Sequence, residues 1–210
     1  PVARFESRNA PFAPEPPSSN VAPVPLAYPT RTDCPPTPPE PPAMKPPMVA
    51  VRRVDGWKRT AEALNRKAAV LTPHGITVGY HNHNFEFAPL GDTNGFEILL
   101  KNTDPALVSF ELDVGWVAAA GVDPAKVFAH HKGRFTQMHV KDIKADTKPN
   151  YVLSMDPTEV GSGVLPWKTL LPAAYAAGVR DFFVEQEPPF ARPRIEAAKI
   201  CHDYLASVVA

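Results

Sequence analysis

The sequence has few cysteines, no long apolar run and no recognisable leader. Its 210 residues include Cys34 and Cys201, which are too few for a disulfide framework and lack the spacing of a metal-binding motif. No window is long and apolar enough to span a bilayer. The N-terminus begins at Pro1 without methionine, consistent with residues missing upstream, and lacks the charged-then-apolar pattern of a secretory signal. These absences predict a protein of the reducing cytoplasm with no membrane partner.

An excess of either charge is also missing. The chain carries 22 basic and 22 acidic side chains, so its formal net charge is zero. A nucleic-acid-binding protein usually shows a basic excess or a basic stripe. We therefore expect no nucleic-acid partner.

Proline, in contrast, is abundant and concentrated at one end. Of the 27 prolines, 16 lie in residues 1–50, where they exclude helices and central strands. The segment also has few large apolar side chains, so burial cannot offset the entropy lost on ordering. We expect residues 1–50 to be disordered or polyproline-like, with a PxxP ligand as the alternative. Residues 51–210 are then expected to form one folded domain.

Residues 51–210 alternate between helical and strand-like patterns. Apolar residues recur at helical spacing over 55–75, and Asp-Pro at the start with Gly at the end predicts a helix over 123–133. The predicted strands are 76–81, 106–113, 134–142 and 180–187, the other predicted helices are 95–102, 166–178 and 192–210, and a long connection covers 143–165. This alternation is typical of an α/β protein with parallel strands and helices packed outside them.

A polar side chain stands at the end of each predicted strand. These residues are His81, Asp113, His139 and Glu185. Sites in open parallel sheets and in (β/α) barrels form at the C-terminal ends of the strands, so we expect the four side chains to meet. Together they offer nitrogen and oxygen ligands that suit Mn²⁺, Co²⁺, Zn²⁺ or Fe²⁺ better than Mg²⁺. Taken singly, Asp113 has a simpler interpretation as a helix cap and His139 as a core histidine.

Further polar residues lie next to these candidate ligands. Side chains of a strand alternate with a period of two, so His83, Lys141 and Glu187 are expected to point the same way as their neighbours at the strand ends. Trp116 is interpreted as a packing residue or as a wall of the pocket.

Five motifs give the sequence a family resemblance. They are YHNHNFEF, LDVGWVAAAGVDP, MHVKD, EVGSGVLPW and FFVEQE, in this order along the chain. Over roughly residues 55–210 they resemble the sugar phosphate isomerase/epimerase family of xylose isomerase-like TIM barrels. The resemblance implies a partial (β/α)₈ barrel of about four C-terminal βα units, because a whole barrel needs about 250 residues. Either the chain is truncated, or a homo-oligomer completes the half barrel and covers its open edges.

The resemblance also implies a metal site. The family usually places Glu, Asp, His and Glu on the last four strands of the barrel. Asp113, His139 and Glu185 match by position, whereas His81 stands where a glutamate is usual. Imidazole binds the same metals, so the implied cofactor is a divalent ion, manganese first, with cobalt, zinc or iron as alternatives. One of the two glutamates that family epimerases use for proton transfer is then missing. The candidates to replace it are His81, His83 and Glu86.

The activity implied by the resemblance is that of an isomerase or epimerase acting on a sugar, a sugar phosphate or a polyol ketone. Glu185 is the expected base that removes the proton next to the carbonyl, with His81 or His83 as its acid partner. The expected substrate-binding residues are Lys141, Glu159, Trp116 and Glu187. Two other functions stay open at this point: a dehydratase or lyase acting on a related keto-sugar or inosose, and a non-catalytic remnant or interaction protein.

Overall fold

Four parallel strands form the central sheet of the computed structural model, which describes residues 53–209. Their order is β1 (Val78–His81), β4 (Val108–Asp113), β5 (Phe135–Val140) and β8 (Asp181–Val184). Each lies within a predicted strand, so the predicted α/β class is confirmed. The predicted disorder of residues 1–50 lies outside the described residues.

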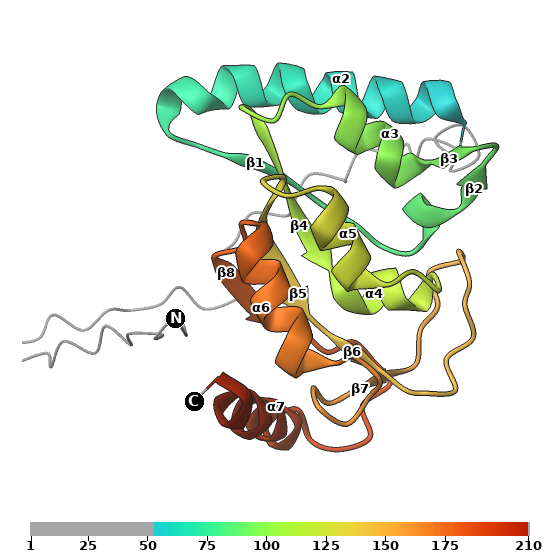
Figure 1. Cartoon of the computed structure of the whole chain (residues 1–210), viewed down its shortest axis with the longest axis vertical. Helices are drawn as coiled ribbons and strands as arrows, with labels where there is room; N and C mark the ends of the chain where they lie inside the picture. Colours follow the sequence, from blue (N-terminus) through green and yellow to red (C-terminus); the bar gives the residue numbers. More distant parts are fainter. Residues whose placement is uncertain (1–52, 210) are drawn as a thin grey trace, which may run out of the picture. The chain divides into compact units, whose positions relative to one another are not determined.

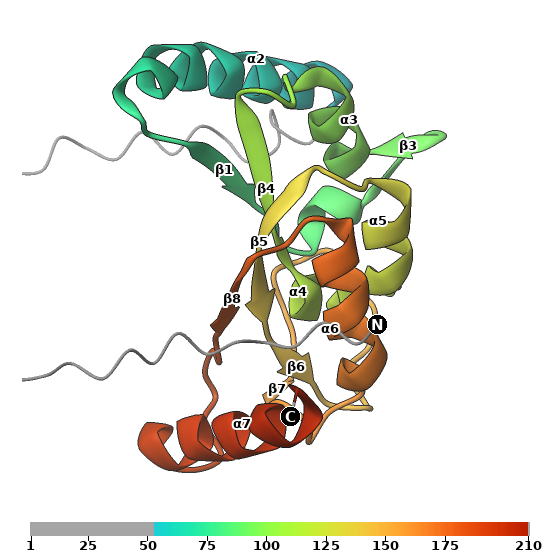
Figure 2. The ribbon, with the colours of Figure 1, turned by 60° about the vertical axis from the view of Figure 1, so that its left-hand side comes forward.

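Helices alternate with the strands of this sheet. They are α2 (Val54–Leu71), α3 (Gly95–Asn102), α4 (Val114–Ala119), α5 (Pro124–His130), α6 (Trp167–Ala177) and α7 (Arg194–Val209). The two views show α3, α5 and α6 on the same face of the sheet (Figures 1 and 2). All were predicted except the short α4, which begins directly after β4. Between residues 53 and 209, no helix combines the length and hydropathy that a membrane span requires.

Small elements interrupt the loops. The predicted long connection over 143–165 takes part in a short antiparallel pair, which joins residues 142–143 to residues 157–158. The small elements are β6 (Asp142–Ile143) with β7 (Pro157–Thr158), β2 (Pro89–Leu90) with β3 (Thr93–Asn94), and the 3₁₀ helices η1 (Thr72–His74) and η2 (Phe85–Phe87).

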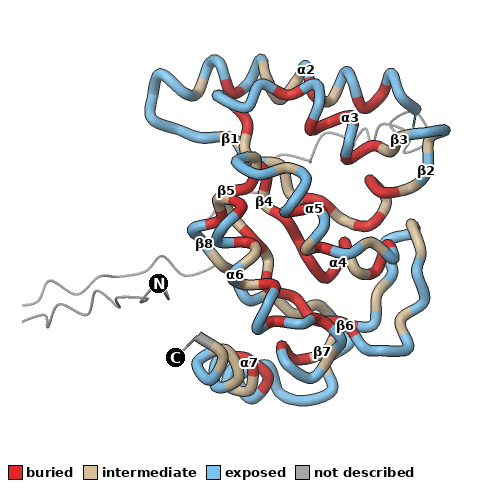
Figure 3. The backbone as a smooth tube through the Cα atoms, viewed as in Figure 1, coloured by how far each residue is buried: buried red, intermediate tan, exposed pale blue. Residues whose placement is uncertain are grey.

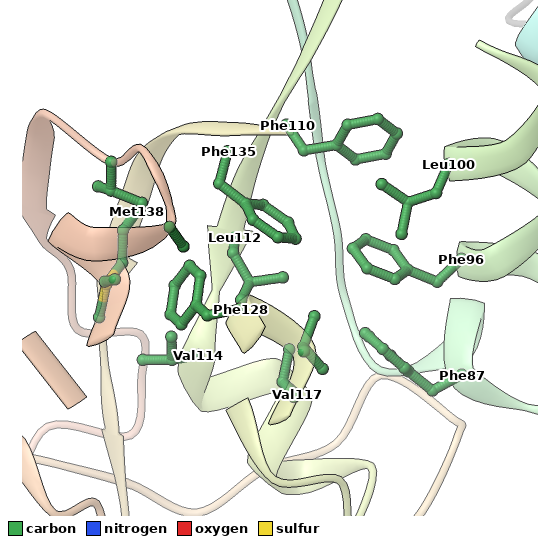
Figure 4. Close-up of a cluster of buried hydrophobic side chains, with 14 of the residues drawn as sticks. Phe87, Phe96, Leu100, Phe110, Leu112, Val114, Val117, Phe128, Phe135 and Met138 are labelled. Carbon is green, nitrogen blue, oxygen red and sulfur yellow. The ribbon is translucent and has the colours of Figure 1, made fainter. Parts of the chain in front are cut away.

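Aromatic side chains fill the space between the sheet and its helices (Figure 4). Phe96 of α3 meets Phe110 of β4 with ring centroids 5.6 Å apart, and Phe128 of α5 meets Phe135 of β5 at 5.2 Å, both edge to face. Such pairs each contribute about 0.5–1.5 kcal/mol beyond the burial of their area. This packing fixes β4 and β5 against the helices and hence fixes where their C-terminal ends lie.

Polar side chains of the same strands point to the opposite face. Successive residues of a strand face opposite ways, and Glu111, Gln137 and His139 line an open hollow of about 350 Å³ together with residues of β8 and its end. Burial falls off towards β8, an edge strand of the sheet (Figure 3), where Phe183 is 45% exposed and Val184 is 47% exposed. The face away from the helices is therefore the one that carries ionisable groups.

Candidate metal centre

The strand register brings three of the predicted ligands together. Asp113 at the end of β4 lies opposite His139 of β5, and His81 ends the neighbouring β1. His81 Nε2 is 3.3 Å from Asp113 Oδ2, and His139 Nδ1 is 3.5 Å from the same oxygen. One ligand atom from each residue lies within 4.8 Å of the others. We call these three residues the His–Asp–His cluster.

Glu185, the fourth predicted ligand, reaches the cluster from β8. Its backbone N–H donates to the carbonyl of Val140, so the parallel pairing continues to this residue. Its carboxylate Oε2 lies 2.7 Å from His139 Nδ1. The side chain is 43% exposed and lines the hollow. Glu185 therefore contacts the cluster at His139, whereas the other three predicted ligands lie within reach of one another. The binding of a metal by the four residues remains a prediction.

Asp113 serves the fold and the cluster with different oxygens. Its Oδ1 accepts a hydrogen bond of 3.0 Å from the backbone N–H of Trp116 and so caps α4, while Oδ2 faces the two histidines. The buried Asn82, at the end of β1, accepts a 3.0 Å hydrogen bond from the Asp113 N–H. The helix-cap interpretation and the ligand interpretation of Asp113 are therefore compatible.

His139 has one ring nitrogen positioned to bind a cation. Its Nδ1 is buried and makes no hydrogen bond of good geometry within the described part of the chain, although it faces Asp113 and Glu185. Its Nε2 lies 3.1 Å from Glu111 Oε1. A carboxylate that accepts the second ring N–H is the usual way in which a histidine ligand is oriented. The donor set therefore fits a divalent ion such as Mn²⁺, Co²⁺, Zn²⁺ or Fe²⁺. Sequence reasoning missed Glu111, although its spacing of two from Asp113 was a signal.

Lys141 and Glu187 lie beside the cluster. Lys141 is completely buried, and its Nζ lies 2.9 Å from Asp113 Oδ2, 3.0 Å from Glu185 Oε2 and 2.6 Å from Glu187 Oε1. The indole N–H of Trp116 donates to the same Glu187 oxygen at 3.3 Å. These three predicted substrate-binding residues thus adjoin the predicted ligands, and their contact with a substrate remains a prediction.

The charges of the site stabilise one another. Burial alone would raise the pKa of Asp113, but His139, His81 and Lys141 hold that pKa well below its usual range. Burial would also raise the pKa of Glu185, yet Lys141 and His139 lower it. The pKa values of His139 and Lys141 are raised by the facing carboxylates against the opposing effect of burial. Both carboxylates are therefore ionised at neutral pH and able to bind a cation.

His83 lies next to the cluster with a different electrostatic environment. Its ring is 5.0 Å from that of His81 and 5.4 Å from that of Trp116, measured between centroids. Burial, and next the charge of His81, lower the pKa of His83. Its imidazole is therefore neutral near pH 7 and can accept a proton or a hydrogen bond.

Glu86 supports the segment that carries His83. Its buried carboxyl accepts hydrogen bonds from the Tyr80 hydroxyl at 2.9 Å and from the His83 backbone N–H at 3.0 Å. Burial raises the pKa of Glu86 to about 7. These contacts favour a structural role over the role of replacement base.

Glu159, a predicted substrate-binding residue, is buried in a different set of contacts. Its Oε1 accepts a 2.8 Å hydrogen bond from Arg192 Nε, and Thr158 donates to its other oxygen. Arg192 belongs to the segment that leads into α7. The structure therefore gives Glu159 a partner from that segment, and its substrate-binding role remains a prediction.

Asp142 organises the loop that follows the site, which sequence reasoning did not anticipate. Its buried carboxylate accepts hydrogen bonds from the backbone N–H groups of Gly161 (3.0 Å), Gly163 (3.3 Å) and Leu165 (3.2 Å), and from the Trp167 indole at 2.7 Å. A methyl group at Gly163 would clash with this carboxylate. The EVGSGVLPW motif is thus fixed to the end of β5 by the aspartate of MHVKD.

Comparison with known proteins relates the chain to one family. The xylose isomerase-like TIM barrel family matches residues 34–206. An inosose dehydratase of Geobacillus thermodenitrificans is 28% identical over 150 residues, which are 65% of this chain and 50% of that protein. The crystal structure of a sugar phosphate isomerase/epimerase from Parabacteroides distasonis superposes with a TM-score of 0.63 and 29% identity, over 73% of this chain and 55% of the other.

A further solved structure is that of the IolI protein with a bound zinc atom. The superposition covers 74% of this chain and 57% of the IolI chain, with a TM-score of 0.57. The sequence identity between the two chains is 17%, which shows a likeness of fold alone. The chain spans about half the length of the curated relatives that it matches. The family match covers most of the sequence, and the four parallel strands with outer helices agree with it. The chain therefore belongs to the xylose isomerase-like TIM barrel family.

Proposed function

We propose that the chain is a divalent-metal-dependent lyase that dehydrates an inosose or a related keto-sugar. The observation that carries this proposal is that its curated relatives are inosose dehydratases, such as those of Geobacillus thermodenitrificans and of Lactiplantibacillus plantarum, the latter 26% identical over 162 residues. This support ranks dehydration above the isomerase or epimerase reaction that the sequence favoured.

The proposed metal ligands are His81, Asp113, His139 and Glu185. When bound, the divalent ion supplies positive charge that stabilises the anion formed at the carbonyl oxygen of the substrate. Manganese remains our first expectation, and cobalt, zinc and iron suit the same donors. Hydrogen bonds hold Asp113 in position among these ligands, because its N–H donates to Asn82 and its Oδ1 accepts from the Trp116 N–H of α4.

Glu185 is the proposed base. Its contacts with His139 and Lys141 are both made by Oε2, which leaves its second oxygen as the proton acceptor. The group that takes the proton must be ionised, and the lowered pKa of Glu185 ensures this. The proton leaves the carbon next to the carbonyl and the hydroxide leaves the following carbon, so the two departing groups balance as one water molecule.

His83 is the proposed partner of Glu185 in handling the substrate. Its neutral imidazole offers one donor and one acceptor nitrogen, which suits a hydrogen bond to a substrate hydroxyl. Trp116, 5.4 Å away between ring centroids, would close the same side of the pocket. Because His81 and His139 are assigned to the metal, His83 is the neighbouring histidine proposed for proton transfer.

A sugar isomerase or epimerase is the second candidate, favoured by the 29% identity and the TM-score of 0.63 to the Parabacteroides enzyme. It would share the abstraction of the proton and differ in returning that proton to another carbon or face. A neutral sugar fits the site better than a sugar phosphate, because Glu111, Asp113, Glu185 and Glu187 surround it with carboxylates. Lys141 is the one lysine or arginine that forms ion pairs with these carboxylates within residues 53–209.

The test is to incubate the purified chain with an inosose and with neutral keto-sugars, in deuterated water containing Mn²⁺. Dehydration predicts a product that is lighter by one water molecule and absorbs in the ultraviolet as a conjugated enone. Epimerisation or isomerisation predicts incorporation of deuterium without loss of water. Mass spectrometry and proton NMR distinguish these products.

The test variant is Glu185→Gln, which removes the proposed base. Its matched control is Glu196→Gln, which removes an exposed carboxylate on α7. Turnover should fall by about a hundredfold or more in the first variant and remain in the second. A wild-type chain that binds metal but turns over none of these compounds would contradict the proposal and favour a non-catalytic role.

A further inference from the structure

Lys141 places a buried ammonium group beside the proposed metal site. Its side chain is completely buried directly after β5. The aliphatic stem packs against Gly115 of α4 so closely that a Cβ atom at position 115 would lie 2.8 Å from Lys141 Cγ. The ammonium lies 5.4 Å from the centroid of the Trp116 ring. The stem is therefore held between α4 and the end of β5, and the ammonium is aimed at the cluster.

The ammonium contacts two oxygens that the proposed metal would also need. Lys141 Nζ is 2.9 Å from Asp113 Oδ2 and 3.0 Å from Glu185 Oε2. The same Asp113 oxygen faces His81 and His139, and the same Glu185 oxygen is 2.7 Å from His139 Nδ1. The Lys141 ammonium and a bound divalent ion would therefore compete for Asp113 Oδ2 and Glu185 Oε2.

Glu187 gives the ammonium a partner outside the set of proposed ligands. Its Oε1 lies 2.6 Å from Lys141 Nζ and accepts a second hydrogen bond from the Trp116 indole. A lysine ammonium has three donors, and Asp113, Glu185 and Glu187 match this number. Glu187 can therefore keep the ammonium when the other two carboxylates turn to a metal.

We propose that Lys141 is an internal counter-cation that sets the affinity of the site for divalent ions. It balances Asp113 and Glu185 when no ion is bound, and it keeps only Glu187 when one binds. An ammonium and a divalent ion that share the same carboxylate oxygens repel each other, most strongly in buried surroundings, so Lys141 weakens ion binding. The same ammonium stabilises the ion-free site, because the carboxylate of Asp113 is fully buried and a buried charge without a partner is costly. This inference rests on the proposed function in one respect, that the cluster binds a divalent ion.

The test measures Zn²⁺ affinity by competition with a chromophoric chelator, and thermal unfolding in EDTA, for the wild-type chain and for Lys141→Met. Loss of the ammonium should tighten Zn²⁺ binding by about tenfold or more and should lower the Tm of the ion-free protein. Lys144→Met, which removes an exposed lysine three positions away, serves as the matched control and should change neither quantity.

A second variant keeps the inference testable if Lys141→Met does not fold. Recovery of folded Lys141→Met only in the presence of Zn²⁺ would support the inference. Glu187→Gln should bind Zn²⁺ about threefold or more weakly than the wild type, because the ammonium then depends on Asp113 and Glu185 alone. Unchanged affinity in Glu187→Gln, or binding by Lys141→Met that is no tighter than wild type, overturns the inference alone. A wild-type chain that binds no Zn²⁺, Mn²⁺ or Co²⁺ overturns the proposed function and the inference together.

Discussion

Replacing Glu86 by glutamine should remove a pH dependence from the stability of the fold. Burial raises the pKa of this carboxyl from 4.5 to about 7, and the side chain is completely buried. A carboxyl whose pKa is higher in the folded state binds more protons when folded. Its contribution to stability is therefore fully present below about pH 4.5 and is lost as the pH rises through about 7.

The size of the effect follows from the pKa shift. One pKa unit corresponds to 1.36 kcal/mol, so ionisation of Glu86 should cost the fold about 3 kcal/mol between pH 4.5 and pH 8. Glutamine carries no charge and can still bond to Tyr80 and to the His83 N–H, which are the two partners of the carboxyl. Relative to wild type, Glu86→Gln should thus gain about 3 kcal/mol over this pH range.

The assay is urea unfolding at half-unit pH steps from 4.5 to 8, followed by fluorescence in the presence of EDTA. The observable is the difference in unfolding free energy between variant and wild type, because other ionisable groups then largely cancel. Glu62→Gln, an exposed glutamate on α2, provides the control and should give a flat difference. A flat difference for Glu86→Gln as well would refute the reasoning that burial governs this carboxyl.

Four further predictions follow from the same structure. Asp113→Ala and His139→Ala should each lower bound metal by about tenfold or more, measured by elemental analysis after equilibrium dialysis, and unchanged metal content in both would show that the site is assigned wrongly. Asp142→Ala should lower the unfolding free energy by about 3–5 kcal/mol in urea titrations, because four N–H groups lose their acceptor, among them the buried Leu165 amide and Trp167 indole; a loss below about 1 kcal/mol would contradict this. Gly115→Ala should destabilise by about 1–3 kcal/mol, because the added methyl meets the buried lysine stem, whereas Gly79→Ala, with ordinary contacts only, should cost less. A homo-oligomer that joins β1 of one copy to β8 of another predicts at least a dimer mass in light scattering at micromolar concentration, and a monomer would exclude it.

The sequence predicted the four central strands and the meeting point of their ends because both depend on local patterns. Apolar runs ended by polar residues locate His81, Asp113, His139 and Glu185 one strand at a time, and parallel pairing then brings the ends together. The structure reproduces this arrangement, with Asp113 directly opposite His139. The strand-end residues were therefore predictable from the sequence, because each depends only on the pattern of its own strand.

Other parts of the site depend on contacts between distant segments, which no local pattern reveals. Asp142 and its loop partners are separated by 19 to 25 positions along the chain, and the Lys141 contact with Glu187 joins residues 46 positions apart. The polar run that contains Glu86 suggested a base, yet the Glu86 carboxyl accepts hydrogen bonds from the Tyr80 hydroxyl and the His83 backbone N–H. Whether a polar group reacts or supports the backbone depends on which neighbours the fold supplies.

The shared carboxylate of Asp113 has a practical consequence for spectroscopy. A ligand that binds Oδ2 changes the charge distribution of the carboxylate, and this changes the hydrogen bond that Oδ1 accepts from the Trp116 amide. The nitrogen and proton chemical shifts of that single amide should therefore report occupancy at the strand ends, without any substrate or chromophore. Titrations of isotope-labelled protein would then follow binding from one backbone position.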